Sequence, residues 1–329
     1  MPSMNKKIGY GLLLAVLLAG PALMYSVLLA KLLCFALFAC AFNLLLGYTG
    51  LLSFGHAVFY GGAAYLTGYA MQELGMPFEV GILAGVAGSA LLGLGMGLLA
   101  VRRQGIYFTM ITLALAQMLY FVCVQVPYTH GEDGMTGIPR GKLLGMFDLS
   151  NDLLMYYVTL AITVAGFALI VRIIHSPYGQ VLKAIKENEP RAVSLGYDVA
   201  RYKLLAFVLS AALTGLAGAT RCLVINQASL SDVEWSMSGL VVLTTLVGGM
   251  GTKFGPILGA VIIVIIDNRL GEVGQWLSDR TGIEWFQSLG GSVTIVTGLI
   301  FIVCVLLFRR GVVGEFVAWM ERRRSTASA

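Results

Sequence analysis

The chain has 329 residues, of which 58% are hydrophobic and only 12% are charged, and its formal net charge is +5. A soluble domain carries roughly 45–50% apolar and about 25% charged residues, so this chain lacks the charge that a water-facing surface needs. The composition excludes an ordinary soluble enzyme or nucleic-acid-binding protein. It predicts an all-α integral membrane protein whose solvent is the lipid bilayer.

Apolar stretches bounded by charged residues, Gly/Pro or polar clusters predict about ten transmembrane helices in a single permease-like domain over residues 1–329. The first stretch is expected to remain as an uncleaved span, because no good cleavage site follows it. The weakest candidate is 236–250, which would make only about 22 Å of helix. The stretches lie near residues 8–21, 22–47, 55–72, 78–101, 106–126, 153–174, 204–225, 236–250, 254–269 and 289–308.

The distribution of Lys and Arg predicts the orientation. With both termini in the cytoplasm, sixteen basic residues fall on the inner side and five on the outer side, which is a strong positive-inside asymmetry. If 236–250 were re-entrant, the basic tail at Arg322 would lie outside, against this rule. The outer basic residues are Lys31, Arg140, Lys142, Arg269 and Arg280.

The longest polar segment on the inner side, residues 176–203, carries two helix signals. Ser176 is a good N-cap, and Pro177 suits the first position of the short helix that follows. Asn188 starts a second short helix, which Gly196 is placed to end. The two helices form either a ledge for a soluble partner or an ordinary solvated loop, and the local pattern leaves both interpretations open.

A glycine-rich break follows the second apolar stretch. Gly47, Gly50 and Gly55 are expected to interrupt the helix, since each costs about 1 kcal/mol relative to Ala. Non-helical backbone at membrane depth is tolerated only inside protein or along a watery cavity. The break therefore either lines a transport pathway or acts as a hinge in a tight inner-side turn. Its polar groups belong to Tyr48, Thr49, Ser53 and His56.

A second glycine-rich stretch covers residues 248–259. It lacks the Gly-Lys-Ser/Thr ending of a phosphate-binding loop, so no ATP or other cofactor is expected in this chain. Close helix packing is the better interpretation. The glycines concerned are Gly248, Gly251, Gly255 and Gly259.

Two basic residues fall inside apolar stretches. Lys31 is expected to snorkel outward, and so is Arg221, which lies near the outer end of its span. Contact between Arg221 and a substrate carboxylate is the alternative. The five cysteines are dispersed and show no CxxC spacing, so neither a disulfide framework nor a metal site is expected.

Several motifs resemble one family of transport proteins. The stretch Asn43-Leu-Leu-Leu-Gly47-Tyr-Thr-Gly50-Leu-Leu-Ser53-Phe-Gly55-His56-Ala57 is similar to the hallmark segment of the branched-chain amino-acid ABC permeases, specifically the M-type subunit of the high-affinity leucine/isoleucine/valine import system. Further stretches agree in order and spacing, so the resemblance covers residues from about 25 to 310. They are Gly131-Glu-Asp133-Gly134-Met-Thr136-Gly137-Ile-Pro139, Gly196-Tyr-Asp-Val-Ala-Arg-Tyr-Lys203 and Gly248-Gly-Met-Gly251-Thr-Lys-Phe-Gly255-Pro-Ile-Leu-Gly259-Ala260.

On the inner side, Glu189-Pro190-Arg191-Ala192-Val-Ser-Leu-Gly196 resembles a degenerate coupling motif of ABC importer permeases. The resemblance implies that this segment couples the permease to an ATP-binding subunit. It also implies that Asp133, Gly134, Thr136 and Gly137 belong to an extracytoplasmic loop at 127–152.

The resemblance implies a fold like that of type II ABC-importer permeases, in a bacterial inner (cytoplasmic) membrane. It further implies an H-type sister permease, two separate ATP-binding subunits that hydrolyse ATP, and an extracytoplasmic solute-binding protein that delivers the amino acid. No enzymatic activity and no nucleic-acid partner are implied for this chain.

Two other functions compete with amino-acid import. A urea or short-amide ABC permease of the same superfamily has a very similar Gly-Tyr-Thr-Gly stretch. An ion-coupled secondary carrier is less well supported, because such carriers usually place acidic residues in the interior of spans and none of the expected spans has one there.

The charge asymmetry predicts that a cysteine introduced at Ser325 is reachable only from the cytoplasm. Labelling with a membrane-impermeant thiol reagent should fail in intact cells and succeed in inside-out vesicles. Labelling from the extracytoplasmic side of intact cells would contradict the orientation.

Overall fold

The computed structural model describes residues 17–18, 20–22, 24–143, 145–266, 268, 298–299 and 302. The spans expected near 8–21 and 289–308 lie almost entirely outside these residues, as does the tail at Arg322. The described chain is mostly helical, in agreement with the all-α prediction, and its strands are only two residues long.

The helices are α2 (Ser26–Thr49), α3 (His56–Gln72), α4 (Phe78–Ala100), α5 (Ile106–Gln125), α6 (Asp152–His175), α7 (Pro177–Glu187), α8 (Glu189–Ser194), α9 (Val199–Ile225) and α10 (Trp235–Gly248), followed by the helix Gly255–Ile266. Short 3-10 turns are η1 (Gly20–Ala22), η2 (Pro127–Thr129) and η3 (Leu230–Asp232). The strands β1 (Met135–Thr136) and β4 (Gln227–Ala228) pair antiparallel, as do β2 (Lys142–Leu143) and β3 (Phe147–Asp148).

Among the described residues, five helices are long and apolar enough to cross a membrane, namely α2, α4, α5, α6 and α9. The helix Gly255–Ile266 is shorter, and so are α3 with 17 residues and α10 with 14. At 1.5 Å per residue α3 and α10 reach about 25 Å and about 21 Å, less than the roughly 30 Å of a hydrocarbon core. The structure thus supports several membrane crossings but does not confirm a count of ten.

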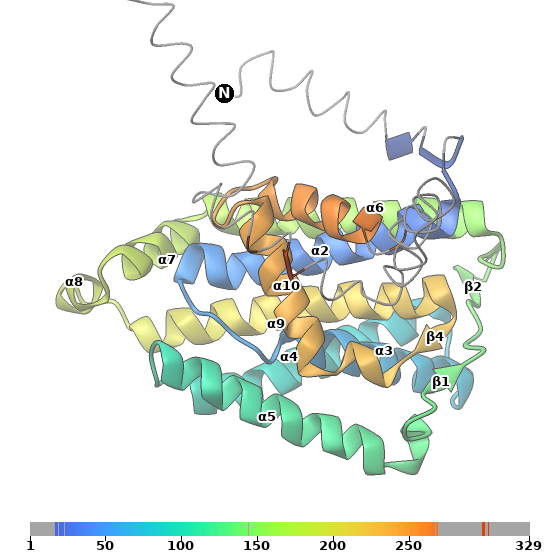
Figure 1. The fold of residues 1–329 in the computed structure, drawn as a ribbon, viewed down its shortest axis with the longest axis horizontal. Helices are drawn as coiled ribbons and strands as arrows, with labels where there is room; N and C mark the ends of the chain where they lie inside the picture. The colour runs from blue at the N-terminus through green and yellow to red at the C-terminus, as the bar shows by residue number, and fades with distance from the viewer. Residues whose placement is uncertain are drawn as a thin grey trace, which may run out of the picture.

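The centre of the bundle is formed by α2 and α9, which lie side by side (Figure 1). Every residue of 33–49 in α2 is buried, and α9 packs against α2, α3 and α4. Small residues allow this close approach: a Cβ at Gly218 would lie 1.9 Å from the carbonyl oxygen of Tyr60. By contrast, α4 and α5 expose large apolar side chains such as Leu83, Leu98 and Phe121, as expected of a lipid-facing surface.

The break after α2 is shorter than the glycine pattern predicts. Gly47 is helical, and α2 ends only at Gly50, whose φ of 76° is left-handed and whose N–H bonds to the carbonyl of Leu46. The prediction that Gly47 interrupts the helix is therefore wrong. A Cβ there would lie 2.8 Å from the backbone nitrogen of Gly251, so its glycine permits a close approach between segments.

The link between α2 and α3 runs back into the bundle (Figure 1). His56, the first residue of α3, lies 2.9 Å from the hydroxyl of Ser210, and that hydroxyl donates to the carbonyl of Ala41 at 2.6 Å. Ala41 precedes the end of α2 by two turns, or about 12 Å of helix. The break is therefore not a tight turn at the end of the bundle, because α3 begins well inside it.

Asn43 joins α2 to the second glycine-rich stretch. Its side chain accepts a hydrogen bond from the N–H of Gly251 at 2.9 Å and donates one to the carbonyl of Thr252 at 2.9 Å. These bonds satisfy backbone groups in the turn between α10 and the helix Gly255–Ile266. We call this pair of hydrogen bonds the Asn43 clamp.

The α10 hairpin, formed by α10 and the helix Gly255–Ile266, depends on glycine contacts. A Cβ at Gly248 would lie 1.9 Å from the carbonyl oxygen of Gly255, and one at Gly259 would lie 2.0 Å from that of Thr244. Gly251 has a different role, since its φ of 77° is left-handed and it forms part of the Asn43 clamp. In Figure 1, α10 crosses α2 and α9 instead of running along them.

Gly248→Ala is expected to destabilise the fold by about 1–3 kcal/mol, because the new methyl group overlaps backbone atoms of the facing helix. Gly95→Ala in α4 is a matched control, since nothing lies within 4 Å of its Cβ position. Thermal unfolding of the purified protein in detergent measures both. Equal unfolding midpoints for the two variants would contradict the tight hairpin.

Asn43→Leu is expected to cost about 1–3 kcal/mol for each backbone group that it leaves unsatisfied. Gln72→Leu removes a similar amide at an exposed position at the end of α3 and should have little effect. The same unfolding assay compares them. If Asn43→Leu unfolds at the wild-type temperature, the clamp does not hold the turn.

Candidate functional site

The non-helical segment 50–55 has its backbone groups bonded partly by side chains of α5 and partly by nearby residues. Thr109 donates to the carbonyl of Leu52 at 2.9 Å, and the hydroxyl of Thr112 accepts from the N–H of Phe54 at 3.3 Å. Within the segment, the hydroxyl of Ser53 accepts from the N–H of Gly55 at 3.2 Å. These bonds meet the requirement that backbone groups at membrane depth find partners inside the protein.

His56 lies in a buried aromatic cluster. Its ring packs edge-on against Phe42, Phe59 and Phe207, with centroids 5.0 to 5.7 Å apart, and the side chain is fully buried. Its Nε2 meets the hydroxyl of Ser210. This is the environment that the hinge interpretation expects of His56.

The remaining polar residues of the first motif also point to backbone or to neighbouring side chains. Thr49 donates to the carbonyl of Leu45 at 2.5 Å. Tyr48 is buried, and the ammonium of Lys183 lies 5.9 Å from the centre of its ring. Asn43 forms the clamp described above. A large cavity lies beside this segment, but none of the motif's candidate residues lines it.

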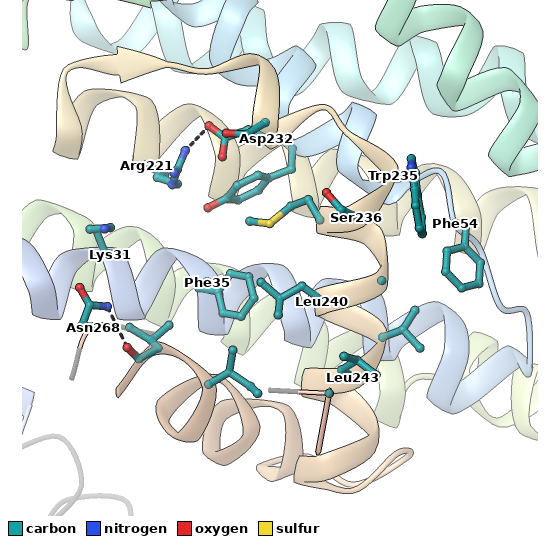
Figure 2. A pocket seen from close by; sticks show the side chains of 18 residues that line it. Lys31, Phe35, Phe54, Arg221, Asp232, Trp235, Ser236, Leu240, Leu243 and Asn268 are labelled. Atoms are coloured by element: carbon teal, nitrogen blue, oxygen red, sulfur yellow. Dashed lines mark hydrogen bonds and ion pairs between the residues drawn. The ribbon is translucent and has the colours of Figure 1, made fainter. Parts of the chain in front are cut away.

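That cavity has a volume of about 800 Å³ and lies between α2, α9, η3, α10 and the helix Gly255–Ile266 (Figure 2). We call it the α10 cavity. The segment 50–55 reaches it through Phe54, a residue that the motif did not single out. In Figure 2, Phe54 and Trp235 lie at one side, and the charged residues lie at the other.

Arg221 and Asp232 form an ion pair in the wall of the α10 cavity (Figure 2). The Asp232 side chain is 4% exposed and that of Arg221 is 18% exposed. The guanidinium also lies 5.7 Å from the ring centre of Tyr60. The expectation that Arg221 snorkels outward is therefore wrong, because a carboxylate within the bundle compensates its charge.

Lys31 also lines the α10 cavity, on the side of Arg221 (Figure 2). Lys31, for which outward snorkelling is expected, is half-buried at this position. Asp232 drew no attention in the sequence, because it follows the span and looks like an ordinary loop residue. Its separation of only eleven residues from Arg221, across the end of α9, is the signal that could have paired them.

The segment 176–203, which the charge pattern predicts to lie on the inner side, forms both expected short helices, α7 and α8. The hydroxyl of Ser176 accepts from the N–H of Gly179 at 3.3 Å, and the side chain of Asn188 accepts from that of Arg191 at 3.1 Å. Gly196 has a left-handed φ of 87° after α8. The predicted N-caps Ser176 and Asn188 and the predicted end of the second helix at Gly196 are therefore confirmed. The span that follows begins earlier than predicted, because α9 starts at Val199.

We call α7 and α8 together the inner ledge, and it is fixed to the bundle at several points. The ammonium of Lys203, only 4% exposed, pairs with Glu189 at 2.6 Å. Lys186 donates to the carbonyl of Gly47 at 2.7 Å, near the end of α2. Tyr178 stacks on Tyr202 and donates to its carbonyl at 2.9 Å, and burial raises the pKa of the Tyr178 phenol.

The surface of the ledge that faces away from the bundle carries exposed apolar side chains. Val193 is 57% exposed and Leu195 is 68% exposed, while Ala192 packs inward. Of the other motif residues, Pro190 and Arg191 are exposed. The ledge therefore presents both apolar and basic side chains away from the bundle.

At the other end of the bundle, the segment 127–152 is tied to the end of α9. Gly134 and Gly137 have left-handed φ values of 69° and 73°, and Thr136 lies in β1, which pairs with β4. Asp133 is exposed. Arg140, which the sequence did not distinguish from other outer charges, is the main anchor.

The Arg140 guanidinium pairs with Asp152 at 2.6 Å and donates to the side chain of Asn226 at 2.9 Å. It also donates to the carbonyl of Val224 at 2.8 Å and so caps the end of α9. Within the described part of the chain, no group of three or more His, Cys, Asp or Glu side chains could hold a metal ion.

Comparison with known proteins identifies relatives across most of the chain. A family model described as the permease component of the branched-chain amino acid transport system matches residues 24–309. The high-affinity branched-chain amino acid transport system permease protein LivM of Salmonella typhimurium is 29% identical over 247 residues, which cover 68% of this chain and 58% of that protein. LivM of Escherichia coli is 28% identical with the same coverage.

The similarity extends to other importers. The ribose import permease protein RbsC of Bacillus subtilis is 28% identical over 201 residues, covering 60% of this chain and 58% of that protein. A solved structure, PsaBC from Streptococcus pneumoniae in complex with Fab, covers 89% of this chain and 95% of that chain with 14% identity and a TM-score of 0.39, too low to carry over any feature. The chain spans 58% of the length of these two LivM relatives. Because the family model matches most of the chain, the chain belongs to the family of branched-chain amino acid transport system permease components.

Proposed function

We propose that this chain is the transmembrane permease subunit of an ATP-driven importer that moves branched-chain or related amino acids into the cell. Family membership supports the class of transporter. The observation that carries the proposal further is that one helix, α2, borders the α10 cavity at Lys31 and is bonded to the inner ledge at Gly47. A cavity for a solute and a surface for a soluble partner are thus mechanically joined.

Under this proposal the chain works in a bacterial inner membrane with both termini in the cytoplasm. An H-type sister permease completes the pathway. Two ATP-binding subunits hydrolyse ATP, one of them docking on the inner ledge, and a solute-binding protein delivers the amino acid from outside. The segment with Asp133 and Thr136 lies on that outer side.

A urea or short-amide importer is the second candidate, and the ribose permease among the relatives illustrates how varied the solutes of this superfamily are. The charged residues of the α10 cavity favour a zwitterion over a neutral solute. An ion-coupled carrier is favoured less, although Asp232 is an acidic residue inside the bundle, because Arg221 already compensates its charge.

Reconstitution of the whole complex in lipid vesicles tests the proposal. Labelled leucine is expected to accumulate only with the binding protein and ATP, and accumulation should persist when ionophores collapse the ion gradients. Leucine uptake driven by an ion gradient without ATP would overturn the proposal, as would uptake of urea with none of leucine.

The inner ledge yields a sharper prediction. Leu195→Asp places a charge on the exposed apolar surface where a partner would dock, and it is expected to lower leucine uptake at least about tenfold while ATP hydrolysis loses its dependence on the binding protein. Leu74→Asp is the matched control, because Leu74, which follows the C-terminal end of α3 and lies away from the ledge, is similarly exposed at 55%. Uptake reduced equally by both variants, or by neither, would contradict docking at the ledge.

A further inference from the structure

We propose that the α10 cavity binds the transported amino acid as a zwitterion, with Arg221 and Lys31 facing its carboxylate and Asp232 facing its ammonium group. Phe35, Leu240 and Leu243 would then contact the aliphatic side chain. The inference rests on the proposed function and goes beyond it, because it names the binding residues and the charge state that they select.

The size of the cavity suits such a solute. Its volume of about 800 Å³ lies within the roughly 300–1,000 Å³ that is usual for small-molecule sites. An amino acid would fit with room for bound water or for side chains of a partner subunit. Size alone therefore permits the solute, and the charges must provide the selection.

Positive charges outnumber negative charges among the described residues of the cavity wall. Among the described residues that line it, Lys31 and Arg221 are cationic and Asp232 is anionic. The Arg221–Asp232 pair is internally compensated, whereas Lys31 is in no ion pair with another described residue. This excess of positive charge among the described lining residues favours the approach of a carboxylate, most strongly where the surroundings are apolar.

The near-complete burial of the ion pair explains why both solute charges matter. Separating Arg221 from Asp232 would leave two poorly hydrated charges, which is costly. A zwitterion can insert between them, since its carboxylate then compensates Arg221 and its ammonium compensates Asp232. A neutral solute offers neither charge, and a simple anion would leave Asp232 without a cation.

The apolar part of the cavity lies next to these charges. Phe35 follows Lys31 by one helical turn on α2, so both side chains lie on the same face. Figure 2 shows Phe35 and Leu240 between the charged residues at one side and Trp235 and Phe54 at the other. A leucine held by its charged end would therefore extend its side chain along apolar surface.

A photoreactive leucine analogue with a diazirine in its side chain tests the site in the complete complex, reconstituted in vesicles with ATP and the binding protein. After illumination, mass spectrometry locates the attached label. We expect label on α2 near Phe35 and on α10 near Leu240 and Leu243. We expect leucine to compete with labelling at least about tenfold better than 3-methylbutylamine, which lacks the carboxylate, or 4-methylpentanoate, which lacks the ammonium.

Variants separate binding from folding. Lys31→Gln leaves the ion pair intact and should reduce labelling about tenfold, whereas Arg103→Gln removes an exposed cation outside the cavity and should not. The double variant Arg221→Gln with Asp232→Asn removes both charges together, so it leaves no orphaned buried charge. It should abolish the advantage of leucine over 4-methylpentanoate, because no anion then faces the ammonium group, whereas Lys31 should preserve part of the advantage over 3-methylbutylamine.

Uptake of labelled leucine is measured in the same vesicles. Uptake with label confined to other segments would overturn the site while leaving the proposed function intact, and so would equal competition by all three compounds in the wild type. Absence of leucine uptake by the wild-type complex would overturn the proposed function and the site together.

Discussion

Backbone groups that leave the helical pattern inside a membrane must find partners within the protein, and the arrangement of this chain depends on how it meets that requirement. Segment 50–55 obtains two of its partners from Thr109 and Thr112 of α5. The turn after α10 obtains them from the Asn43 clamp, and the hydroxyl of Ser238 accepts from the N–H of Ala57 at 2.8 Å. These side chains allow α3 and α10 to be short and to begin or end inside the bundle.

The same interactions place the α10 cavity. Because α3 starts deep in the bundle, Phe54 reaches the cavity wall directly from the non-helical segment. Because α10 and the helix Gly255–Ile266 pack through glycine contacts, they form a thin hairpin that crosses the central helices. The cavity is the space between this hairpin and α2, closed at one side by the Arg221–Asp232 ion pair.

A single helix connects the parts that a transporter must coordinate. Lys31 on α2 lines the cavity, Asn43 holds the turn of the α10 hairpin, and the carbonyl of Gly47 binds Lys186 of the inner ledge. The ledge is also held to α9 by the buried Lys203–Glu189 pair. A displacement of the ledge would thus act on both central helices, and through Asn43 on the hairpin that forms one wall of the cavity.

Local features of this chain could be predicted from its sequence, and contacts across long separations could not. Ser176, Asn188 and Gly196 are short-range cap signals, and they marked α7 and α8 correctly. Gly47 was misinterpreted because a glycine that admits a neighbouring backbone looks the same as one that ends a helix. The partners of Arg221 and Arg140 depend on where loops fold back onto α9, which hydrophobic patterns do not encode. The family motif singled out polar residues of the segment beside the cavity, but Phe54 is the residue of segment 50–55 that lines it.

Residue-resolved hydrogen exchange of the assembled complex in lipid tests the central claim most directly. If side chains hold the non-helical segments, the amides of Phe54, Gly55, Ala57 and Gly251 should exchange far more slowly than in an unfolded peptide, because each donates to a specific hydroxyl or amide oxygen. Replacement of Asn43 by Leu should release the amide of Gly251 and leave that of Ala57 protected. Exchange of all four amides at unfolded-peptide rates in the wild-type complex would contradict the account.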